Sequence, residues 1–276
     1  MEFVTKEEVF YDYVLLRYSP IKEYENKARI SNILLHSFEE NSLDKEFSTL
    51  LSEIRNEIGI NQTVWGIKLQ NKEIKWEFYF YRIYDKKTVS LKNILKILKK
   101  YFKVENLHID ETLPYIMFSF DIDKRKIINT SHIYFEKCFA DSFQAWSYQL
   151  SSEKVEFENH YEFFKPEKYP EIIKKIYNSP FITRESNILK ILYPDLMKCK
   201  SICIAAKRNS NGIYFQGIDI KQFLFFLREF NYPQYIIEFL EKNKELLDYI
   251  LYDVGFDYTI KNGKVTISKS AFYGTF

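Results

Sequence analysis

The spacing of the apolar residues changes near residue 60 of this chain. Before it, apolar residues recur three or four positions apart, as at Ile30, Ile33, Leu34 and Phe38, which is the spacing of one helix face. After it, apolar and polar residues alternate along short stretches, which is typical of strands with one buried face. The pattern predicts a helical N-terminal part over about residues 21–58 and a body of hairpins and helices over about 63–276.

The alternating stretches come in pairs that are joined by turn residues. Asn71 and Lys72 separate the first pair, and Asn211-Gly212 and Asn262-Gly263 are stronger turn signals in later pairs. Five hairpins are predicted: 64–69 with 74–82, 116–122 with 132–136, 143–150 with 155–164, 202–207 with 213–218, and 254–260 with 264–271. Helices are predicted at about 90–102, 170–177, 185–193, 222–230 and 234–251.

These elements indicate an α+β fold with a large antiparallel sheet of about ten strands. The chain has only 7 Gly and 7 Pro, and no linker composition separates the hairpins, so we expect one domain over residues 1–276. The C-terminal KSAFYGTF is apolar to its last residue, and we expect it to dock into the body or a partner.

Each predicted strand has an apolar face and a polar face. The apolar faces must be covered by the helices. Two arrangements are compatible with the polar faces. They meet water, in an open sheet with helices on its other face, or they line the interior of a closed αββα barrel that is wide enough for a ligand. Tyr79, Tyr81, Tyr134 and Tyr214 recur on the polar face, and together with lysine they suit a site for an anionic, partly apolar ligand.

Charge and hydropathy exclude some classes of function. Lys and Arg number 40 against 38 Asp and Glu, and this balance is not that of a dedicated nucleic-acid-binding protein. No stretch has the length and apolarity of a membrane span, and the N-terminus is too polar for a signal peptide, so we expect a cytoplasmic protein. Glu158, His160 and Glu162 share one face of a predicted strand and have the chemistry of metal ligands, but a solvated strand face explains them better.

Three segments resemble hairpins of the ABBA-type aromatic prenyltransferases: GIKLQNKEIKWEFYFY, FSFDIDKRKIINTSHIYF and VGFDYTIKNGKVTISKSAFYG. The barrel of that family has ten antiparallel strands in five hairpins, ringed by helices. The resemblance implies transfer of an isoprenoid group from its diphosphate to an aromatic or other electron-rich acceptor. It leaves open the need for Mg²⁺.

The same resemblance implies roles for residues of the polar face. Glu77 or Asp121 would orient the acceptor or take its proton. Strict alternation places Arg82 and Lys269 on the apolar face, although both are candidates for the diphosphate. The diphosphate candidates are Lys68, Arg82, Lys207, Tyr214 and Lys269, and Tyr79, Tyr81 and Tyr134 would shield the allylic cation.

Two alternatives stay open beside the resemblance. Each of these residues is also explained as an ordinary side chain of the sheet surface. The whole chain is also explained as a non-catalytic binding or protein-interaction factor, such as a biosynthetic accessory or a defence-related protein, that uses the polar sheet face. The sequence leaves the oligomeric state open as well.

Overall fold

The computed structural model describes residues 1–82, 89–105, 107, 112–128, 130–139, 142–151, 154–182 and 186–276. Within them, the five predicted hairpins are present and supply ten long strands. These are β1 (Thr63–Gln70), β2 (Glu73–Tyr81), β4 (Met117–Ile122), β6 (Ser131–Phe139), β7 (Ser142–Leu150), β8 (Val155–Phe164), β9 (Ser201–Lys207), β10 (Asn211–Ile218), β11 (Tyr252–Lys261) and β12 (Lys264–Thr275).

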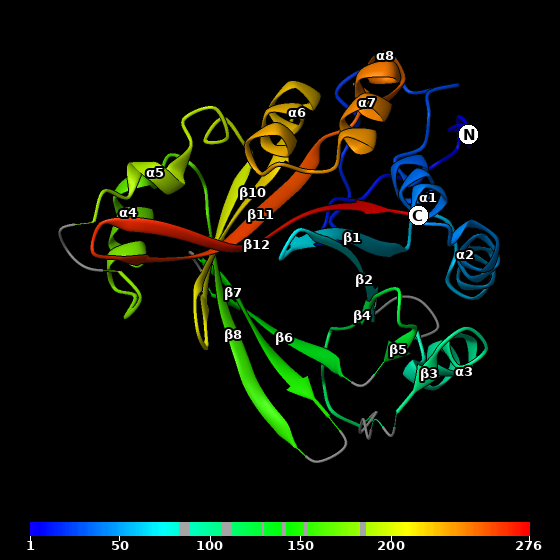
Figure 1. Cartoon of the computed structure of the whole chain (residues 1–276), viewed down its shortest axis with the longest axis horizontal. Helices are drawn as coiled ribbons and strands as arrows, with labels where there is room; N and C mark the ends of the chain where they lie inside the picture. Colours follow the sequence, from blue (N-terminus) through cyan, green and yellow to red (C-terminus); the bar gives the residue numbers. More distant parts are fainter. Residues whose placement is uncertain are drawn as a thin grey trace.

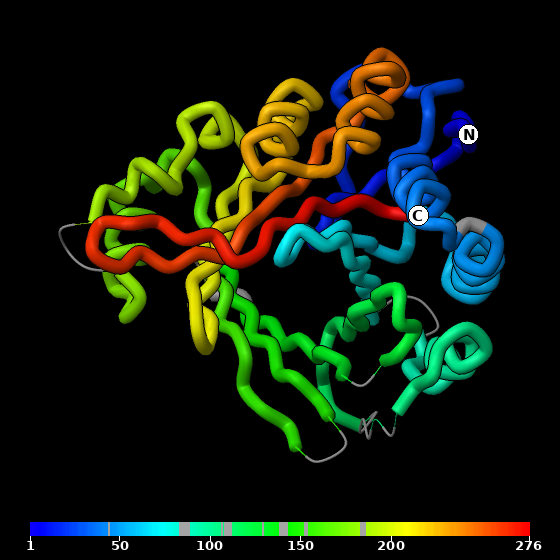
Figure 2. The backbone as a smooth tube through the Cα atoms, viewed as in Figure 1, coloured from blue at the N-terminus to red at the C-terminus, as the bar shows by residue number. Residues whose placement is uncertain are grey.

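The ten strands close into an antiparallel barrel in the order β1-β12-β11-β10-β9-β8-β7-β6-β4-β2 (Figure 1). Strands that are consecutive along the chain lie side by side, as the tube in Figure 2 shows, so the chain runs round the barrel up and down. The closed-barrel alternative is therefore confirmed, and the polar strand faces line its interior. A short parallel pair, β3 (Lys103–Val104) with β5 (Ile127–Ile128), lies outside the barrel and was not predicted.

The last strand closes the barrel. β12 pairs with β1 from Gln70↔Lys269 to Val64↔Thr275, and the Phe276 N–H donates to the Thr63 carbonyl at 3.0 Å. Phe276 itself is fully buried. This confirms that the apolar C-terminal segment docks into the body, because it supplies the strand that leaves the sheet without an edge.

The helices lie on the outside of the barrel (Figure 1). The predicted N-terminal helical part begins ten residues late, at Ser31, and the predicted helix over 234–251 is broken at Asn243. The predicted start at Glu185 lies outside the described residues, and a single turn remains of that helix. The helices are α1 (Ser31–Glu40), α2 (Asp44–Ile58), α3 (Leu91–Leu98), α4 (Tyr169–Tyr177), α5 (Leu189–Leu192), α6 (Ile220–Glu229), α7 (Gln234–Lys242) and α8 (Lys244–Leu247).

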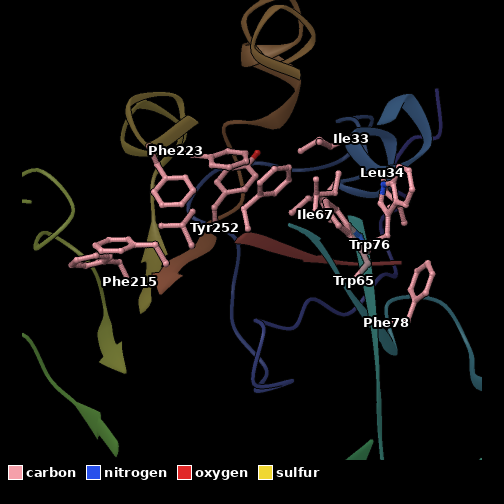
Figure 3. Close-up of a cluster of buried hydrophobic side chains, with 14 of the residues drawn as sticks. Ile33, Leu34, Trp65, Ile67, Trp76, Phe78, Phe215, Phe223 and Tyr252 are labelled. Atoms are coloured by element: carbon pink, nitrogen blue, oxygen red, sulfur yellow. The ribbon is translucent and has the colours of Figure 1, made fainter. Parts of the chain in front are cut away.

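The main hydrophobic core lies between these helices and the outer face of the barrel, as expected (Figure 3). Trp76 of β2 is fully buried under α1, where its indole N–H donates to Ser37 Oγ at 3.0 Å. On another side of the barrel, Phe223 of α6 stacks on Tyr252 of β11 with 4.4 Å between ring centroids. None of the described helices has the length and apolarity needed to cross a membrane.

Candidate functional site in the barrel interior

Five tyrosines form a closed ring halfway along the barrel interior. Neighbouring rings of this tyrosine ring have their centroids 6.0–6.5 Å apart all the way round. They come from every second strand of the barrel, namely β2, β6, β8, β10 and β12. Its members are Tyr79, Tyr134, Tyr161, Tyr214 and Tyr273.

Each tyrosine of the ring has a small residue directly opposite it on a neighbouring strand. Gly255 faces Tyr214 and Gly66 faces Tyr273, and a Cβ atom added at these glycines would lie 2.2 Å and 2.9 Å from the respective tyrosine ring. Serine or alanine takes this place for the other three tyrosines. Alternation of large and small residues lets five aromatic rings share one cross-section of the barrel.

A short N-terminal hairpin, residues 11–17, fills the centre of the tyrosine ring. Tyr13 stacks on Tyr273 with 4.0 Å between centroids and lies 5.4 Å from Tyr79. Its main chain is held by two bonds, because its N–H donates to Asp253 Oδ2 at 2.9 Å and its carbonyl accepts from the Tyr81 hydroxyl at 2.6 Å. Tyr13 therefore divides the interior into two compartments.

The compartment on the hairpin side of the ring is mainly apolar. This mouth cavity has a volume of about 460 Å³. Arg82 lies at its rim, where its guanidinium donates to the Leu113 carbonyl at 2.9 Å and covers the Tyr115 ring at 4.5 Å. The apolar walls include Leu15, Ile116, Met117, Phe143, Ala145, Phe163 and Cys203.

The compartment on the other side of the ring is charged. Its volume is about 340 Å³, and it reaches solvent at the barrel end, where the Asp121 side chain is 42% exposed. Nine acidic or basic side chains line it. Arg208 is bonded to Glu156 and to the Phe157 carbonyl. The other eight are called the charged layer: Lys68, Glu77, Asp121, His132, Glu158, Lys207, Asp257 and Lys269.

The first group of the charged layer is a lysine between two carboxylates. Lys68 Nζ lies 2.7 Å from Glu77 Oε1 and 2.6 Å from Asp121 Oδ2, and the Tyr79 hydroxyl donates to the other Glu77 oxygen at 2.8 Å. Burial opposes the charged forms, but attraction across the group outweighs it. The pKa of Lys68 is raised, that of Glu77 is lowered, and that of Asp121 falls to about 2. All three groups therefore stay charged at neutral pH.

The second group reverses the arrangement and places a carboxylate between two lysines. Lys207 Nζ lies 2.8 Å from Asp257 Oδ1, and Lys269 Nζ lies 3.5 Å from Asp257 Oδ2. Lys207 also donates to the Tyr214 hydroxyl at 2.9 Å. Burial is the largest influence and lowers the pKa of both lysines, but the surrounding acidic groups, Asp257 first among them, together raise it above the usual value.

The third group is a histidine–carboxylate pair. His132 Nδ1 lies 2.9 Å from Glu158 Oε2, and Ser147 Oγ donates to the same oxygen at 3.2 Å. Burial opposes charge on both partners, yet their attraction raises the pKa of His132 and lowers that of Glu158 to about 2. Ser147 is bonded to the carboxylate and not to the imidazole, so the three residues do not form a nucleophile–base–acid relay.

Two β-bulges bring charged residues into this layer. On β12, Ser268 has no partner in the pairing with β11, and this extra residue turns the Lys269 side chain inward. The prediction that Lys269 lies on the apolar face is therefore wrong, because it assumed strict alternation. On β8 the pairing with β7 skips Glu158, which then points inward beside Asn159. His160 stays on the outer face, where it bonds Gln144 and stacks on Trp146, so the predicted shared face with Glu158 does not exist.

The structure brings together most of the residues that the sequence singled out. Tyr81 lies nearer the mouth, and Arg82 stands beyond the end of β2 at the rim. Tyr13, Tyr161, Tyr273, His132 and Asp257 were missed, and Glu158 was expected on a solvated strand face. Lys68, Glu77, Asp121, Lys207 and Lys269 are in the charged layer, and Tyr79, Tyr134 and Tyr214 are in the tyrosine ring.

The hairpin also brings two carboxyl groups together. Burial and the neighbouring Asp12 raise the pKa of Asp253 to about 7, although backbone N–H groups and Lys200 oppose the shift. Because the folded state holds this proton more tightly than the unfolded state, the free energy of unfolding should fall as pH rises from about 4 to 7. Asp12→Asn keeps an oxygen for the Val14 and Leu16 N–H groups and removes the repulsion.

We expect Asp12→Asn to be more stable than the wild type at pH 7.5 and about equally stable at pH 4.5. Urea unfolding at both pH values measures this. A variant that loses stability equally at both pH values would show that the two carboxyls do not interact.

The chain is distantly similar to a protein of known name. The sequence matches no family model. It is 24% identical, over 90% of its length, to a protein of Acanthamoeba polyphaga mimivirus named as a putative JmjC domain-containing protein. The chain spans less than half of that relative, 47% of its length.

The resemblance to aromatic prenyltransferases is wrong. The relative carries the name of a different kind of domain, and no prenyltransferase family matches. The interior also lacks the expected chemistry, because Lys68, Lys207 and Lys269 each pair with a carboxylate, and only one ammonium charge of the Lys207–Asp257–Lys269 group is left unbalanced. A diphosphate would need several cations whose charge is not already balanced.

Proposed function

We propose that the barrel is a binding chamber for a small, mainly apolar molecule that carries a ring. The observation that supports this most is the mouth cavity of about 460 Å³, which lies within the usual range for ligand sites. Its floor is the tyrosine ring with Tyr13 in its centre, and its walls are aromatic and aliphatic. Aromatic floors favour flat ring systems, since edge and stacked contacts contribute beyond buried area.

The polar groups of the mouth would orient such a ligand. Gln216 and Glu136 stand on the wall, and Arg82 stands at the rim. The tyrosine hydroxyls point away from the mouth, toward partners in or beside the charged layer: Tyr79 donates to Glu77, and Tyr214 accepts from Lys207. The ligand would therefore meet ring faces and few hydroxyl groups, which favours an apolar molecule over a sugar-like one.

An iron-dependent oxygenase of the JmjC type fits the residues less well. Such a site needs two histidines and a carboxylate that converge on one metal ion. In the described part of the chain, no three His, Cys, Asp or Glu side chains are arranged to hold a metal ion. The up-and-down strand order also differs from the jelly roll of cupin-like barrels, which is built from Greek keys.

Filling the mouth cavity should abolish binding of an apolar probe. Ala145 of β7 is buried on the cavity wall, so Ala145→Phe places a ring in the cavity. We expect the affinity for the neutral fluorophore N-phenyl-1-naphthylamine to fall at least about tenfold, which corresponds to about 1.4 kcal/mol. Fluorescence titration of the folded variant measures this.

Ala206→Phe is the matched control, because Ala206 neighbours the interior-facing Ala205 and Lys207 on β9 but points to the outer face. Its affinity should stay within about twofold of the wild type. Equal binding by Ala145→Phe and the wild type would overturn the proposed function.

A further inference from the structure

The charged layer is a second binding compartment, separate from the mouth cavity. Tyr13 and the tyrosine ring stand between the two, and each compartment has its own cavity. Buried ion pairs of this kind seldom add net stability over apolar side chains of the same volume. Eight charged groups round an unfilled space of about 340 Å³ therefore do not follow from folding alone.

The charges of the layer form two groups of opposite net charge and one neutral pair. Lys68 with Glu77 and Asp121 is one ammonium with two carboxylates, which leaves a net single negative charge. Lys207 and Lys269 with Asp257 are two ammoniums with one carboxylate, which leaves a net single positive charge. His132 and Glu158 neutralise each other as a pair.

Asp121 and Lys207 lie on opposite sides of the lumen, whereas Lys269 lies beside the first group, because β12 pairs with β1, the strand of Lys68. Asp121 is on β4 and Lys207 is on β9, and three strands separate β4 from β9 on one side of the barrel and five on the other. A ligand with one charge would match one group and oppose the other. A ligand with an ammonium at one end and a carboxylate at the other matches both.

We propose that this compartment binds a small zwitterion, with its ammonium toward Glu77 and Asp121 and its carboxylate toward Lys207 and Lys269. The ligand enters from the open barrel end, where Asp121 and Lys269 are partly exposed, at 42% and 21% of their side chains. Apolar molecules are excluded because they would strip water from the charged groups without replacing its hydrogen bonds.

The probe for this proposal is 4-aminobutanoate, which has both charges and no ring. Its comparators are butanoate and butylamine, with one charge each, and the neutral 1,4-butanediol. Chemical-shift titration of the ¹⁵N-labelled full chain at pH 7 gives the dissociation constants. We expect the zwitterion to bind at least about tenfold more tightly than any comparator.

Two variants test the two ends of the ligand, and each leaves its neighbours paired, so that the fold survives. Lys269→Met leaves Asp257 with Lys207, and Asp121→Asn leaves Lys68 with Glu77. Each variant should bind 4-aminobutanoate at least about fivefold more weakly than the wild type. Lys261→Met should leave this affinity unchanged, because Lys261 is exposed and outside the compartment.

Ala145→Phe separates this proposal from the proposed function, since it fills the mouth cavity and leaves the charged layer intact. It should abolish probe binding and leave 4-aminobutanoate binding unchanged. The zwitterion proposal is overturned by no binding of 4-aminobutanoate, by equal binding of a comparator, or by equal binding in both charge variants.

Discussion

Lys68→Met should lower the free energy of unfolding by about 3–5 kcal/mol, the usual cost of breaking a buried ion pair by removing one partner. Lys68 and Glu77 are each only 4% exposed, so the variant leaves the Glu77 carboxylate in the interior without its cation. The loss should shrink as pH falls, because Glu77 is then protonated at little cost. Urea unfolding at pH 7.5 and pH 5 measures both effects.

Lys75→Met is the control for this prediction. Lys75 lies directly opposite Lys68 on β2 but is only half-buried, and it donates to Gln70 at 3.4 Å. Its loss should change stability by no more than about 0.5 kcal/mol. A cost below about 1 kcal/mol for Lys68→Met would mean that the charged layer is hydrated enough to tolerate an unpaired carboxylate.

Trp76→Ala should destabilise the protein by about 3–5 kcal/mol, as large-to-small substitutions in a core do. The indole packs against Phe38 of α1 at 5.4 Å and Phe47 of α2 at 6.2 Å between ring centroids. It joins the first two helices to the barrel wall. The variant should also leave Ser37 Oγ without its donor in a buried position.

Phe157→Ala is the corresponding control on β8, because Phe157 is 48% exposed. We expect a change within about 0.5 kcal/mol in thermal or urea unfolding. A small cost for Trp76→Ala would show that α1 and α2 are not held to the barrel through this residue.

The sequence predicts the hairpins because local signals define them. Asn211-Gly212 and Asn262-Gly263 turn between alternating stretches, and all five pairs form as predicted. Closure could not be predicted, since a strand that faces water and one that faces a polar lumen have the same alternation. Whether the sheet closes depends on the pairing of β1 with β12, which joins residues about two hundred positions apart in the sequence.

The parts of the site that sequence reasoning missed or placed on the wrong face depend on departures from regular geometry. Lys269 and Glu158 face the lumen because each strand carries a bulge, and alternation cannot be continued across a bulge. Tyr13 comes from a segment with no strand or helix period. Gly66 and Gly255 could have indicated the tyrosine ring from the sequence. Glycine inside a strand often marks a place where another group packs closely on the backbone, and here that group is a tyrosine ring.

The mistaken family resemblance has a physical origin. Alternating hairpins with aromatic and basic strands describe any wide antiparallel barrel with a polar lumen, so they indicate fold and not chemistry. What separates this interior from a diphosphate site is the carboxylate opposite every lysine of the charged layer. Lys68–Glu77 and Lys269–Asp257 pair within one hairpin each, whereas Lys68–Asp121 and Lys207–Asp257 join different hairpins and depend on how these pack in the barrel.

Methyl NMR of ¹³C-methionine-labelled protein tests the binding chamber most directly. The chain has 3 methionines, Met1, Met117 and Met197. Met117 lines the mouth cavity, Met197 packs on the outer core, and Met1 is 62% exposed. If the chamber binds ring-bearing apolar molecules, N-phenyl-1-naphthylamine will shift the Met117 methyl through its ring current and leave the other two in place. An unmoved Met117 at saturating probe, or equal shifts at Met1 and Met197, would contradict the account.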